Sequence, residues 1–74
     1  MATETTVKRI RQALDNCFVA GCAIHPWGGT LPLDEDEVAR VHKMRVNASL
    51  EGKAALSELI AANDVLLEEI GRGE

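Results

Sequence analysis

The chain has 74 residues, a formal net charge of -4 and 46% hydrophobic residues. This length allows no more than one domain, and the apolar fraction is too high for a disordered chain. The acidic balance argues against nucleic-acid binding, because nucleic-acid binders normally carry a basic stripe and the basic clusters here are short.

The first predicted element is a helix over about residues 6–20. Thr5 and Thr6 are candidate N-caps, because their hydroxyls can accept hydrogen bonds from the first free backbone N–H groups. Apolar residues then recur at steps of three and four, which predicts one buried stripe. The stripe consists of Val7, Ile10, Leu14, Cys17 and Phe18. Gly21 can adopt the left-handed conformation that ends a helix.

Residues 21–34 form a predicted structured loop, because both prolines, three of the six glycines and the only tryptophan fall there. The indole of Trp27 offers a large apolar face, and Gly28 and Gly29 allow close backbone approach. Trp27 has two open roles, as a contact residue or as a cap on the core. The candidate contacts with a ligand or partner are His25, Trp27, Gly28, Gly29, Arg40 and Arg45.

A helical region over about residues 35–70 follows the loop. Asp34 stands where an N-cap should be, and Glu37 lies three residues further on, which is a capping-box spacing. Leu33 is placed to pack against Val38 as a hydrophobic staple.

The weak point of this helical region is the stretch 46–52. It contains a β-branched residue, two residues that prefer caps and a glycine, but no proline. The pattern favours one long helix, bent at this stretch, over two helices joined by a short turn. Gly71 and Gly73 end the helix, and we expect residues 71–74 to fray.

These elements predict an all-α domain over residues 1–74, either a helical hairpin or a three-helix unit. A long second helix would leave much of its apolar face uncovered, and soluble monomers rarely expose such a stripe. We therefore expect a homo-oligomer, most simply a dimer, in which Asn63 sets the register between copies. The predicted interface comprises Ala55, Leu56, Leu59, Ile60, Asn63, Leu66, Leu67 and Ile70.

Cys17, Cys22 and His25 are the candidate metal ligands, since thiolates and imidazoles bind zinc. Their spacing is not that of the common zinc modules, and Cys17 also fits the apolar stripe, so we predict no metal. A disulfide is not expected, because it would have to span the helix end in a reducing compartment. Cys22 and His25 lack a third group to orient the base, so we predict no enzyme and no cofactor.

Residues 1–6 are polar, and no apolar run approaches the length of a membrane span. We therefore expect a cytoplasmic protein that does not enter membranes. The predicted function is binding and modulation of a partner protein, as a regulator or inhibitor. The alternative is an oligomer that binds a small or anionic molecule through residues 25–30 and nearby arginines. A zinc-stabilised module is the third hypothesis.

Overall fold

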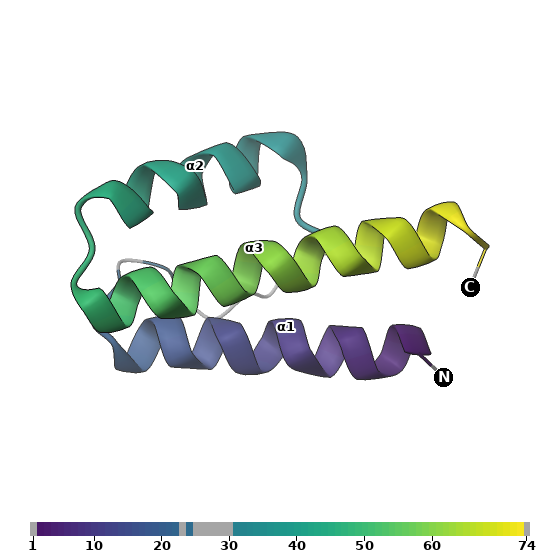
Figure 1. The fold of residues 1–74 in the computed structure, drawn as a ribbon, viewed down its shortest axis with the longest axis horizontal. Coiled ribbons are helices and arrows are strands. Elements are labelled where there is room, and N and C mark those ends of the chain that lie inside the picture. Colours follow the sequence, from purple (N-terminus) through teal and green to yellow (C-terminus); the bar gives the residue numbers. More distant parts are fainter. Residues whose placement is uncertain (1, 23, 25–30, 74) are drawn as a thin grey trace.

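The structure is a computed structural model that describes residues 2–22, 24 and 31–73. This part of the chain contains three helices and no strand: α1 (Ala2–Val19), α2 (Glu35–Val46) and α3 (Leu50–Gly71). α3 lies between α1 and α2 and runs antiparallel to both (Figure 1). The predicted all-helical fold class is confirmed, and the arrangement is the three-helix one.

The break between α2 and α3 is a short capped turn. The N–H of Asn47 bonds to the carbonyls of Met44 and Arg45, which closes α2. Ser49 then caps α3, because its hydroxyl accepts a hydrogen bond from the N–H of Gly52 at 3.1 Å. The favoured prediction of one continuous helix is wrong, and the alternative of two helices joined by a turn is right.

Because the chain turns back at this point, α2 covers part of α3. The core is built where α1 and α2 each pack against α3. Its fully buried large side chains include Ile10, Cys17, Val41, Leu56, Leu59 and Leu66. The expectation that a single chain leaves the α3 face exposed is wrong for Ala55, Leu56, Leu59, Asn63 and Leu66, all of which are buried.

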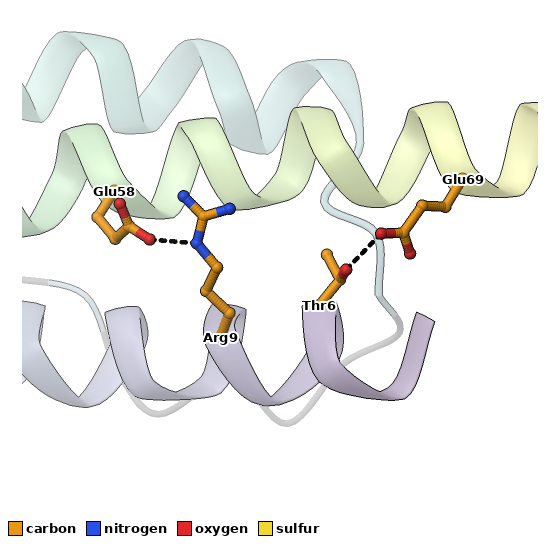
Figure 2. Close-up of polar contacts among 4 residues, drawn as sticks. All are labelled: Thr6, Arg9, Glu58 and Glu69. Carbon is orange, nitrogen blue, oxygen red and sulfur yellow. Dashed lines mark hydrogen bonds and ion pairs between the residues drawn. The ribbon is translucent and has the colours of Figure 1, made fainter. Parts of the chain in front are cut away.

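α1 begins at Ala2, so the predicted start at Thr5 or Thr6 is wrong. Thr6 is not a cap, because its side chain is buried against α3. Its hydroxyl donates a hydrogen bond to Oε1 of Glu69 at 2.6 Å (Figure 2). A partner 63 residues away in sequence therefore accounts for this polar residue on the buried face.

The buried stripe of α1 is confirmed at Ile10, Leu14 and Cys17 but not at Phe18, whose side chain is 61% exposed. Successive residues are rotated by about 100° around an α-helix, so Phe18 points away from the line that Cys17 follows into the core. The end of α1 is as predicted, since Gly21 adopts a φ of 81°.

An ion pair adds a second polar contact between α1 and α3. The guanidinium of Arg9 donates to the carboxylate of Glu58, across the surface of the two helices (Figure 2). This hydrogen bond holds the pKa of Glu58 below its ordinary value. The two side chains are 43% and 45% exposed, so solvent screens the pair and it contributes little to stability.

The predicted N-cap of α2 at Asp34 is confirmed. The carboxylate of Asp34 accepts a hydrogen bond from the N–H of Glu37 at 2.9 Å. Leu33 is buried and Val38 packs against the same core cluster, as expected of a hydrophobic staple. The carboxylate of Glu37 binds Arg40 at 2.8 Å, on the outer surface of α2.

Candidate functional site

Asn63 fixes the end of the connector to the middle of α3. Its side chain is fully buried, and its Oδ1 accepts a hydrogen bond from the N–H of Leu33 at 2.7 Å. Its Nδ2 donates to the carbonyl of the same residue at 3.3 Å. Asn63 therefore sets a register within one chain, between the start of α2 and α3.

A groove of about 680 Å³ lies beside this contact, between the first turns of α2 and the second half of α3. The side chains of Pro32, Leu33, Val38, Ala39 and Leu67 make its lining mainly apolar. The titratable groups along it are Asp34, Glu35, Asp64 and His42. α2 supplies one side of the groove and α3 the other, so their packing creates it.

The charge along the groove is acidic. Three of its residues are carboxylates, and the described residues that line it include no lysine or arginine. Asp34 and Glu35 stand at the N-terminus of α2, where the helix dipole favours negative charge. Asp64 adds a third carboxylate from α3, and all three are solvent-exposed.

Apolar surface continues from the groove along α3. Leu67 is 46% exposed and Ile70 is 48% exposed. Asp64, Leu67 and Ile70 follow one another at three-residue steps, which places neighbours on the same side of a helix. The groove and this continuation together make a contact surface that includes the three carboxylates.

Of the predicted contact residues, the structure describes Arg40 and Arg45. His25, Trp27, Gly28 and Gly29 fall outside the described residues. Arg40 pairs with Glu37, and the guanidinium of Arg45 donates to Oγ of Ser57 at 3.3 Å, linking α2 to α3. Neither arginine lines the groove.

The residues of the predicted oligomer interface fall into a buried group and an exposed group. Ala55, Leu56, Leu59, Asn63 and Leu66 belong to the core of one chain, Ile60 is partly buried against it, and Leu67 and Ile70 are half-exposed. Among these eight residues, Leu67 lines the groove. The residues that the sequence analysis missed, such as Asp64 and Ala39, have helix-surface spacing and gain a role only from the packing of α2.

Two of the three candidate zinc ligands come together. Cys17 and Cys22 meet at the end of α1, and both are free thiols. His25 lies outside the described residues. Within the described ranges, no group of three histidine, cysteine or acidic side chains is placed to hold a metal ion.

Comparison of the chain with protein-family models, with curated proteins and with solved structures found no match. Within residues 2–22, 24 and 31–73, no helix combines the length and the apolarity needed to cross a membrane.

Proposed function

We propose that the protein is a small helical interaction protein whose partner docks in the groove between α2 and α3. The observation that carries this proposal is an apolar groove bordered by three carboxylates. Apolar residues supply most of the binding energy at protein interfaces, and charges select the partner. The partner that fits is a polypeptide segment with apolar anchors flanked by lysine or arginine.

The extent of the apolar surface favours a polypeptide over a small molecule. Ile70 lies one turn beyond Leu67 on α3 and is 48% exposed, so it carries apolar area beyond the groove. A small ligand would leave this continuation uncovered, whereas an amphipathic helix presents anchors over several turns.

The acidic border favours a different protein over a second copy of this chain. A two-fold symmetric dimer through the groove would bring Asp34, Glu35 and Asp64 of both copies to one interface. Like charges that face each other across an interface are unfavourable. A basic partner replaces this repulsion with attraction.

A matched pair of peptides tests the proposal. Both are amphipathic helices with the same leucine anchors, and their polar faces carry either lysine and arginine or glutamate. We expect fluorescence polarisation to detect binding of the basic peptide, weakening as salt is added. The acidic peptide should not bind.

Charge reversal locates the binding site. We expect Asp64→Lys to lower the affinity for the basic peptide by roughly fivefold. The substitution replaces an attractive charge at the groove with a repulsive one. Asp15→Lys is the matched control, since Asp15 is an exposed carboxylate on α1. Equal effects of the two substitutions, or equal binding of the two peptides, would contradict the proposal.

A further inference from the structure

Cys17 and Cys22 are joined by the turn that ends α1. The N–H of Gly21 bonds to the carbonyl of Phe18 at 3.0 Å, and the N–H of Cys22 bonds to the carbonyl of Cys17 at 3.0 Å. With the positive φ of Gly21, these bonds define a Schellman motif. This motif commonly brings the side chains at the positions of Cys17 and Cys22 into contact.

The environment of the two thiols confirms that they are neighbours. The pKa of Cys17 is raised to about 11, first by burial and then by the charge and the hydrogen bond of Cys22. The turn folds Cys22 back toward Cys17, so a disulfide between these two free thiols would bridge the end of α1.

The two cysteines differ in access. Cys17 is fully buried, whereas Cys22 is partly exposed and lines a cavity of about 310 Å³ between the end of α1 and the α2–α3 turn. The Sγ of Cys22 also lies 3.1 Å from the position that a Cβ on Gly52 would take. The absence of a side chain at Gly52 thus leaves room for this thiol against α3.

We propose that Cys17 and Cys22 form a dithiol site that a hydroperoxide oxidises to an intramolecular disulfide. The thiolate of Cys22 attacks the peroxide, the O–O bond breaks, and the leaving oxygen takes a proton, so that Cys22 becomes a sulfenic acid. The sulfur of Cys17 attacks the sulfur of Cys22, the S–S bond forms, and the hydroxyl leaves with the thiol proton as water. Two thiols and one hydroperoxide thus give a disulfide, an alcohol or water, and a further water.

The difference in solvent access between the two thiols determines which one is oxidised first. A reagent from solvent reaches Cys22 through the cavity but does not reach the buried Cys17. Cys22 is therefore oxidised first, and Cys17 is the resolving thiol because it is already in contact with Cys22.

Hydrogen peroxide on the full chain tests the proposal, with alkylation of the remaining thiols and peptide mapping by mass spectrometry. We expect a Cys17–Cys22 disulfide within one chain, which dithiothreitol reverses. In Cys17→Ala the sulfenic acid of Cys22 should persist and react with dimedone, whereas in Cys22→Ser the thiol of Cys17 should stay reduced. Persistent dimedone labelling of the unsubstituted chain, without a disulfide, would overturn the proposal.

A second measurement does not depend on the folding of any variant. The equilibrium between the dithiol and the disulfide in glutathione redox buffers gives the effective concentration of the two thiols. It is measured for the folded chain in water and for the unfolded chain in urea. We expect it to be at least about tenfold higher in the folded chain, because the turn holds the thiols together. An equal or lower value in the folded chain would overturn the proposal.

Discussion

At the residue scale, Asn63 and Asp34 show which roles can be inferred from local spacing. Asp34 caps α2 through a residue three positions away, so the sequence alone predicted its role. Asn63 bonds to the backbone of Leu33, which is 30 residues away. The sequence placed Asn63 on a buried face but assigned it a partner in another copy, because nothing local identifies Leu33.

We expect Asn63→Leu to lower the free energy of unfolding by about 1–3 kcal/mol, because the buried N–H and C=O of Leu33 would lose their partner. Urea denaturation followed by circular dichroism measures this loss. Asn16→Leu is the control, since Asn16 is exposed on α1, and its effect should stay within about 0.5 kcal/mol. Equal losses in the two variants would show that the contact with Leu33 contributes nothing specific.

At the element scale, two helix ends matched their local signals and two boundaries did not. Gly21 and Asp34 acted as the sequence predicted. The start of α1 was missed because Thr6 faces α3, and the break at Asn47–Ser49 was judged a bend because no proline stands there. The energy that decides between a bend and a turn comes from packing α2 on α3. The local sequence pattern gives no information about this energy.

We expect Ser49→Ala to destabilise the chain by about 1 kcal/mol, because the first turn of α3 would lose its cap on the N–H of Gly52. Thermal and urea unfolding measure the loss. Ser49→Asp is the matched control, since an aspartate at this position keeps a side-chain oxygen that can accept from the N–H of Gly52. A loss of stability in Ser49→Asp as large as that in Ser49→Ala would contradict the assigned cap.

At the scale of the whole molecule, the apolar surface that is exposed for self-association differs from the one that the sequence predicted. Phe18, Val19, Val46 and Leu50 are 61%, 84%, 73% and 86% exposed. They stand at the end of the molecule where α1 and α2 finish and α3 begins, at the left of Figure 1. Self-association stays a prediction. The interface that we now predict for it is this end of the molecule, in place of the buried residues of α3.

Two variants separate folding from association. Leu59→Ala should lower the free energy of unfolding by about 2–5 kcal/mol, since it opens a cavity in the core. Val46→Ser with Leu50→Ser should lower the mass found by sedimentation velocity and leave the unfolding free energy within about 1 kcal/mol. Dissociation in Leu59→Ala without loss of stability would restore the predicted α3 interface.

The sequence by itself determined the helical class, the caps at Gly21 and Asp34, and most of the stripe that α1 buries. These features depend on groups within a few residues of one another, so spacing and side-chain chemistry suffice. Only the tertiary structure decided that α2 turns back on α3, which buries Leu59 and Asn63 in one chain and forms the acidic groove. The free energy of that choice comes from contacts between residues far apart in sequence, and it is gained only when all three helices pack together.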